Sequence, residues 1–298
     1  MIRSAVRRAA EFALGGVVAD RLIRTHRGQD LLVLALHNVV PDDAPQAGDR
    51  SLHLRLGTFR GLLERLLKVG APVSLDGTDM LGQGPWFAVT FDDAYRGATT
   101  LALPELSQLG VPSTVFVPTA LMGDHTFWWD ELADPHEGLD PELRRVALDE
   151  LRGHGPSIRA WAAKHGRTAR ELGPLWRSAS VEELSAAARL PGVALAAHSA
   201  THRALDRLER VELEEELLSS IAWFEAMRLP FRRLLAYPYG RCSTTVMAAA
   251  AAAGYEKAWI VSGGWTPSRE RGNFALPRLN VPGGASVRGA MLRAADLL

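Results

Sequence analysis

Four apolar segments of the chain each run directly into residues that can bind a metal or move a proton. They are Leu31–His37, Trp86–Asp93, Val193–His202 and Arg232–Gly240. Continuous apolar runs of this length are typical of parallel strands that are buried on both faces. Parallel α/β enzymes place their active sites at the carboxyl ends of such strands. The four segments therefore predict one α/β sheet whose strand ends share a single catalytic site.

The size and charge of the chain restrict the class of protein. Its 298 residues suit one barrel-sized α/β domain or two smaller ones. Lysine plus arginine and aspartate plus glutamate both number 34, and this balance argues against a general nucleic-acid binder. Cys242 is the only cysteine, which excludes an internal disulfide and a cysteine-based zinc site.

Strand-like and helix-like segments alternate after about residue 30, which favours a barrel of seven or eight strands. Helices are expected over residues 58–69 (with Gly70 as the stop), 101–109, 181–188, 209–227 and 245–253. Further strands are expected over residues 113–117, 234–237, 258–261 and 274–281. Residues 122–178 interrupt the alternation and contain no clear strand, so we expect a helical insertion, which often covers an active site.

Residues 1–30 are predicted to form a helical extension ahead of a barrel domain over residues 31–298. The basic start and the apolar stretch Phe12–Val18 superficially resemble an export signal, but the apolar part is interrupted and no convincing cleavage site follows. An amphipathic helix packed on the domain is favoured. The alternative is a helix that contacts a membrane surface through residues 1–26. We therefore expect a cytoplasmic protein and leave membrane association open.

Asp92 and Asp93 end the second apolar segment. Neighbouring side chains of an extended strand point to opposite faces, so both reach one cavity only if the chain turns there. Two carboxylates in one cavity can divide the work, one binding a cation and the other acting as a base. The alternative is a helix N-cap followed by an acid in the first helical turn.

His198 and His202 follow the third apolar segment with a spacing of four residues. This spacing lets two imidazoles face one metal ion from a helical turn or from a strand-to-loop turn. With one aspartate they make a two-histidine, one-carboxylate set that leaves positions for water and substrate, as catalytic zinc sites do. The alternative is two unconnected polar histidines at the start of a loop.

Three motifs resemble those of the polysaccharide deacetylase family, also called the NodB-homology or carbohydrate esterase family 4 domain. They are TFDDAY (Thr90–Tyr95), HSATH (His198–His202) and AYPYG (Ala236–Gly240), and the similarity extends over about residues 31–282. The resemblance implies an α/β fold, a distorted (β/α)7–8 barrel of the NodB-homology type. It also implies hydrolytic removal of N-acetyl groups from amino sugars.

The resemblance further implies a role for each motif residue. Asp92 would be the general base that deprotonates the attacking water. Asp93, His198 and His202 would hold a divalent ion, usually Zn2+. The main-chain N–H of Tyr239 would donate to the oxyanion, although an ordinary turn after a strand is the alternative for this motif.

Two departures from the family pattern point to further residues. No late Leu-x-x-x-His motif follows His202, but LALHNV (Leu34–Val39) is similar to an early strand of members with circularly shifted motifs. His37 is therefore the expected general acid that protonates the leaving amine, unless backbone groups satisfy it. The arginine that orients the base in many members is also missing. Arg278 is expected either to replace it by pairing with Asp92 or to face solvent.

Aromatic residues near the motifs are candidates for binding substrate. Trp128 and Trp129 would stack on a sugar ring or anchor the insertion, and Tyr237 belongs to the third motif. Trp265 would form an apolar wall near the acetyl methyl group, or pack in the core. Five histidines without a motif are expected at the surface or in a lid: His53, His125, His136, His154 and His165.

The expected function is metal-dependent N-deacetylation of an amino-sugar-containing glycan, oligosaccharide or glycan precursor. A close alternative is removal of formyl or another small acyl group from a lipid-linked or nucleotide-linked amino sugar. A non-catalytic glycan-binding protein of the same fold is a third possibility, which the intact Asp92, Asp93, His198 and His202 disfavour. The sequence indicates no nucleic-acid partner and no particular oligomeric state.

Overall fold

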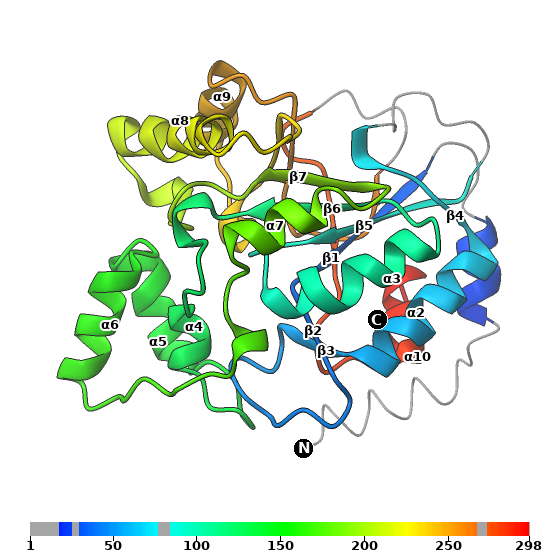
Figure 1. The fold of residues 1–298 in the computed structure, drawn as a ribbon, viewed down its shortest axis with the longest axis horizontal. Coiled ribbons are helices and arrows are strands. Elements are labelled where there is room, and N and C mark those ends of the chain that lie inside the picture. The colour runs from blue at the N-terminus through cyan, green and yellow to red at the C-terminus, as the bar shows by residue number, and fades with distance from the viewer. Residues whose placement is uncertain (1–17, 26–29, 77–83, 267–272, 298) are drawn as a thin grey trace.

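The structure is a computed structural model that describes residues 18–25, 30–76, 84–266 and 273–297 (Figure 1). Its centre is a curled sheet of nine strands in the order β10-β1-β5-β6-β7-β8-β9, with β4 beside β5 and β11 beside β1. The strands are β1 Leu31–Leu36, β4 Ala71–Pro72, β5 Trp86–Phe91, β6 Ser113–Val117, β7 Val193–Ala197, β8 Leu234–Ala236, β9 Lys257–Trp259, β10 Trp265–Thr266 and β11 Leu279–Asn280. All pairs are parallel except β10, which runs antiparallel to β1. The predicted α/β barrel fold is confirmed.

Alternate residues of the strands belong to two different apolar clusters. Leu31 and Val33 of β1 pack in the cluster enclosed by the curled sheet, whereas Leu32, Leu34 and Leu36 pack in the larger cluster on the helical side. Side chains of a strand alternate between its faces with a period of two. The alternate residues that face the enclosed cluster form a row, here called the enclosed row. Continued past the end of β1, this row reaches His37. The same row reaches Asp92 after β5 and His198 after β7.

The segment 273–281 connects the two ends of the curled sheet. Leu276 pairs with Trp259 of β9, and β11 then pairs with Leu34 and Ala35 of β1. The strand predicted over residues 274–281 is thus shortened to β11, because Pro277 has no N–H to donate to a ladder. Arg278 lies within this connecting segment.

Helices cover the outer face of the sheet, and all of them except the last lie close to predicted positions. They are α2 Leu56–Val69, α3 Leu103–Gln108 (continuing from the π-helical turn η2 Ala98–Ala102), α7 Val181–Ala187, α8 Arg210–Ala226, α9 Thr244–Ala252 and α10 Val287–Ala294. In α2, the residues Phe59, Leu62, Leu63 and Leu66 recur at helical spacing and are buried. A short parallel pair, β2 Asn38–Val40 and β3 His53–Arg55, lies outside the main sheet.

Residues 122–178, between β6 and α7, are helical and contain no strand. Their helices are α4 Trp128–Glu131, α5 Pro141–Arg145, the π-helical η4 Val146–Glu150 and α6 Gly155–Lys164, followed by the 3-10 turn η5 Pro174–Trp176. Figure 1 shows α4, α5 and α6 as a group at one side of the sheet. The Asp140 carboxylate accepts a hydrogen bond from Leu143 N and caps α5.

The described part of the N-terminal extension is a helix over residues 18–25 that packs on the domain. Ala19 and Ile23 are buried in the large apolar cluster, and Asp20 forms an ion pair of 2.7 Å with Arg65 of α2. Residues 1–17, which carry most of the segment predicted for membrane contact, lie outside the described residues. No described helix is long and apolar enough to cross a bilayer.

Candidate metal and active site

The carboxylates of Asp92 and Asp93 reach the same cavity because the chain turns between them. Asp92 N still donates to Leu36 O at 2.8 Å, whereas Asp93 adopts a left-handed φ of 66°. This turn removes the strand alternation that would send the two side chains to opposite faces. Neither carboxylate is the N-cap of η2, whose N-cap is Gly97. The pair therefore belongs to the cavity rather than to the start of a helix.

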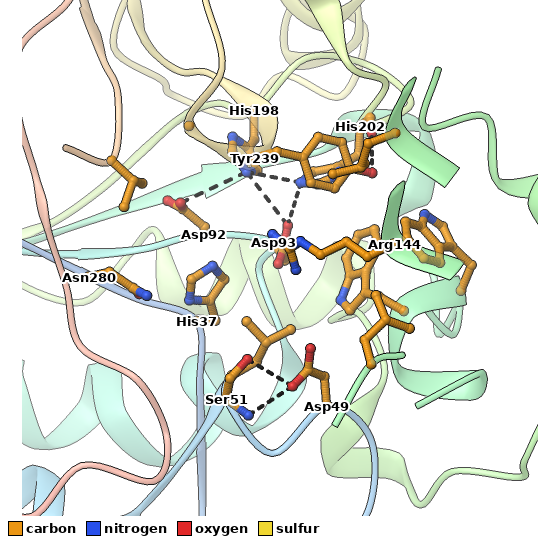
Figure 2. A pocket seen from close by; sticks show the side chains of 17 residues that line it. His37, Asp49, Ser51, Asp92, Asp93, Arg144, His198, His202, Tyr239 and Asn280 are labelled. Atoms are coloured by element: carbon orange, nitrogen blue, oxygen red, sulfur yellow. Dashed lines mark hydrogen bonds and ion pairs between the residues drawn. The ribbon is translucent and has the colours of Figure 1, made fainter. Parts of the chain in front are cut away.

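Asp93, His198 and His202 form a buried cluster whose donor atoms lie within 4.8 Å of one another. His202 Nε2 is 3.1 Å from Asp93 Oδ1 and 3.2 Å from His198 Nε2, and His198 Nε2 is 3.6 Å from Asp93 Oδ1. Figure 2 shows these side chains pointing toward one another. Two imidazoles and one carboxylate converging in this way suit a divalent ion such as zinc, with positions left for water or substrate.

The tautomer of His198 also suits a metal ligand. Its Nδ1 donates to Ala236 O at 2.7 Å, which leaves the lone pair of Nε2 facing Asp93 and His202. Burial lowers the pKa of His198 to about 4, against the opposing effect of Asp92. The imidazole is therefore neutral near pH 7, as metal ligation requires.

Arg278 lies within the curled sheet, fully buried, and forms a bidentate ion pair with Asp92. Its Nη1 is 2.6 Å from Asp92 Oδ1 and its Nη2 is 2.8 Å from Asp92 Oδ2, while Nη1 also donates to Thr90 Oγ1 at 3.1 Å. Burial alone would raise the pKa of Asp92, but the charge and the hydrogen bonds of Arg278 reverse this and hold it well below the ordinary value. Asp92 is thus ionised and held in one orientation. The solvent-facing alternative for Arg278 is excluded.

His37 and Tyr239 complete the cavity, which has a volume of about 160 Å³. The buried Nδ1 of His37 has no hydrogen-bond partner among the described residues, so backbone groups do not satisfy it. Tyr239 has a left-handed φ of 60°, its ring packs on His202 at a centroid distance of 4.6 Å, and its hydroxyl donates to His202 O at 3.1 Å. Backbone outliers of this kind cluster at functional sites.

Trp128 and Trp129 line the cavity but are also buried anchors of the insertion. The Trp129 ring contacts that of His202 at 4.6 Å, and its Nε1 donates to Tyr95 Oη at 2.8 Å. Tyr95 in turn donates to Asp130 Oδ2 at 2.6 Å. The insertion is thereby attached directly beside the histidine pair.

His53 is not at the surface as expected, but buried beneath the insertion. Its Nε2 lies 2.9 Å from Asp130 Oδ1 and its Nδ1 lies 3.1 Å from Asn38 Nδ2. These contacts connect β2 and β3 with α4. The sequence around His53 contains no motif because its partners come from distant segments.

Tyr237 and Trp265 are placed away from the cavity, which corrects their assignment to substrate binding. Tyr237 is fully buried and its hydroxyl donates to Phe274 O at 3.0 Å. Trp265 pairs with Leu32 near the start of β1, whereas His37 follows the end of that strand. At about 3.3 Å per residue, this separates them by roughly 16 Å along the strand. Trp265 donates to Ala294 O of α10 instead of forming a wall near the acetyl group.

Sequence reasoning missed several residues that line the cavity. They include Asp49, Ser51, Arg144, Val261 and Asn280. Asn280 lies two residues after Arg278 in the segment that joins β9 to β1, so the strand period offered a signal for it. Val261 ends the strand predicted over residues 258–261, so the same period offered a signal for it. The others lie in loops or in the insertion, where no motif marks them.

Comparisons with known proteins identify the family and the fold. Residues 82–258 match the family model described as polysaccharide deacetylase, and no curated protein matches. A polysaccharide deacetylase from Bacillus cereus has a similar structure (TM-score 0.63, 17% identity, 90% of this chain and 69% of that one). IcaB from Ammonifex degensii is also similar (TM-score 0.61, 17% identity, 90% and 96%), as is the deacetylase PplD from Streptococcus pyogenes (0.60, 15%, 89% and 98%). The family match, with a barrel of the same type around it, shows that the chain belongs to the polysaccharide deacetylase family.

Proposed function

We propose that the protein is a metal-dependent hydrolase that removes N-acetyl groups from an amino-sugar glycan or glycan precursor. The observation that carries this proposal is the convergence of Asp93, His198 and His202 beside an ionised Asp92 in one cavity. The donor set fits a zinc ion, and the neutral state of His198 supports ligation. When bound, such an ion polarises the amide carbonyl and lowers the pKa of water.

Asp92 is the proposed general base that takes the proton of the attacking water. Arg278 binds both of its oxygens, so the carboxylate is oriented and stays ionised over the whole range near neutral pH. The same pairing makes Asp92 a weaker base, and its contribution depends on position as much as on proton affinity.

His37 is the proposed general acid, on the side of the cavity formed by β1. It follows the strand that pairs with β5 in register, Leu36 opposite Phe91, so His37 comes next to Asp92. The unpartnered Nδ1 is available for proton exchange, and its proton would go to the nitrogen of the leaving amine. The main-chain N–H of Tyr239 is the proposed donor to the oxyanion that forms on the acetyl carbonyl.

The test is acetate release by Asp92→Asn from acetamido sugars, with the metal content measured on the same samples. We expect activity to fall by about 10²–10⁴-fold while the metal is retained, since Asp92 is not in the ligand cluster. Asp76→Asn is the control, because Asp76 pairs with Arg232 outside the cavity. Equal turnover by wild type and Asp92→Asn would refute the proposed role.

The same assay distinguishes the alternatives for the acyl group. Faster release of formate than of acetate from matched amino sugars would favour a deformylase. A metal-loaded protein that binds glycans but releases no acyl group would be a non-catalytic member of the family.

The cytoplasmic location and membrane contact through residues 1–26 remain proposals, which cell fractionation of the full-length chain and of a chain lacking residues 1–17 would test.

A further inference from the structure

We propose that Arg144 binds an anionic group of the substrate, so that the enzyme acts on amino sugars bearing a phosphate or a carboxylate. This inference rests on the proposed deacetylase function and specifies its substrate class. Arg144 belongs to α5 of the insertion and lines the same cavity as Asp93 and His202. Figure 2 shows its side chain extending into the cavity.

Arg144 differs from every other arginine of the insertion in having no counterion among the residues that the structure describes. Residues 122–178 contain seven arginines, and six of them form ion pairs with carboxylates. The six are Arg145, Arg152, Arg159, Arg167, Arg170 and Arg177. The Arg144 guanidinium has no hydrogen bond or ion pair with a described residue. Its five N–H donors are therefore open to a ligand.

The carboxylates of the cavity are already paired with other groups. Asp92 is bound by Arg278, and Asp93 lies against His202. Asp49 Oδ1 accepts from Ser51 N at 3.0 Å and from Ser51 Oγ at 2.8 Å. None of these carboxylates forms an ion pair with Arg144 among the described residues, although Asp49 keeps its negative charge because serine donors do not neutralise it.

The position of Arg144 is fixed by its helix rather than by a side-chain partner. Leu143, Val146 and Ala147 are buried in the core, and this holds the opposite face of α5 and η4 toward the cavity. Leu148 follows Arg144 by four residues, lies on the same face and also lines the cavity. Arg144 itself is exposed, so a ligand that enters the cavity from solvent can reach its guanidinium.

A guanidinium presents paired N–H donors that match the oxygens of either phosphate or carboxylate. Within the described parts of the chain, no other lysine or arginine lines the cavity. A neutral amino sugar would leave the Arg144 charge without a partner, whereas an acidic substituent close to the acetamido group would pair with it. The charge thus discriminates between the two substrate types.

The test compares Arg144→Gln with Arg145→Gln, whose arginine pairs with Glu142 and Glu150 away from the cavity. Binding to the metal-loaded protein is measured with glucosamine, glucosamine 1-phosphate and muramic acid, which carry no acetyl group to hydrolyse. Acetate release is measured separately with the three N-acetyl counterparts. Comparing glucosamine 1-phosphate with muramic acid identifies whether phosphate or carboxylate is preferred.

We expect wild type to bind at least one acidic sugar about tenfold or more tightly than glucosamine, and Arg144→Gln alone to lose this preference. The preference should weaken as the salt concentration rises. Equal binding of the three sugars, including no binding of any, overturns the inference, as does an equal loss in Arg145→Gln. Acetate release without charge preference would leave the proposed function standing and overturn this inference. Charge-selective binding without acetate release would refute the function instead.

Discussion

Arg278 and Asp92 are 186 residues apart in the chain, yet they form a bidentate ion pair with both N–O distances below 3 Å. Asp92 follows β5, whereas Arg278 lies in the segment that joins β9 to β1. The curled sheet therefore has to be completed by residues 273–281 before the proposed base is oriented. This couples the last part of the barrel to the activity proposed for Asp92.

Replacing Arg278 with methionine should lower both stability and activity. Removal of one partner of a buried ion pair leaves an uncompensated charge and costs about 3–5 kcal/mol of unfolding free energy. The pKa of Asp92 should also rise toward or above its ordinary value, because burial raises it once the arginine is absent. Urea unfolding and acetate release measure the two effects.

The double variant Asp92→Asn/Arg278→Met separates these effects. With both charges removed, we expect most of the lost stability to return while activity stays as low as in Asp92→Asn. Additive losses of stability in the double variant would contradict a direct energetic coupling between the two residues.

The cluster of Asp93, His198 and His202 predicts a large effect of His198→Ala on metal content. The substitution removes one of three protein donors, so the purified protein should hold far less than one equivalent of zinc and release little acetate. His165→Ala is the matched control, because His165 is exposed and packs on Trp161. Metal analysis after dialysis measures the difference. Wild-type metal content in His198→Ala would show that the cluster does not hold the ion.

The residues found from the sequence are those whose position depends on local rules. Asp92 and His198 follow apolar runs, and the strand period of two places them in the enclosed row. Arg278 was found only as one of two alternatives, because its pairing depends on how distant strands are joined. His37 and Arg278 both lie outside the residues 82–258 that match the family. The family motifs therefore cover only part of the candidate site.

The predictions that differ from the structure do so for equally specific physical reasons. The sequence leaves Trp265 either as a wall near the acetyl group or as a core residue, and the first of these is wrong because β10 pairs antiparallel with the start of β1, away from the cavity. Arg144 and Asp49 carry no local signal, since their place in the cavity depends on how the insertion and the β2–β3 region pack against the barrel. Such packing is set by contacts like Asp130 with His53 and Tyr95, which link segments far apart in the chain.

The lowered pKa of His198 predicts how the metal-free protein responds to acid. An unfolded histidine titrates near 6.5, whereas burial holds the folded value at about 4. Between these two values the unfolded chain binds a proton that the folded protein does not, so stability falls as the pH is lowered from 6.5 toward 4. The loss amounts to about 3 kcal/mol over this window. The carboxylates of Asp92 and Asp93 contribute only at lower pH, because their pKa values are depressed below 3.8.

Urea unfolding in the presence of a chelator, at pH 7 and pH 4.5, measures this dependence. His198→Gln should lose that part of the pH dependence, whereas the exposed His165→Gln should keep it. The same slope in wild type and His198→Gln would show that His198 does not contribute it.

The role of His37 can be isolated through the leaving group of the substrate. A general acid matters when an amine leaves, because the nitrogen must be protonated as the C–N bond breaks, whereas 4-nitrophenolate leaves without a proton. His37→Gln should therefore release acetate from an acetamido sugar about 10²–10⁴-fold more slowly and hydrolyse 4-nitrophenyl acetate at nearly the wild-type rate. Metal content should not change, since His37 is outside the ligand cluster. His154→Gln, outside the cavity, serves as the control. An equal loss on both substrates would instead indicate that His37 positions water or shapes the cavity.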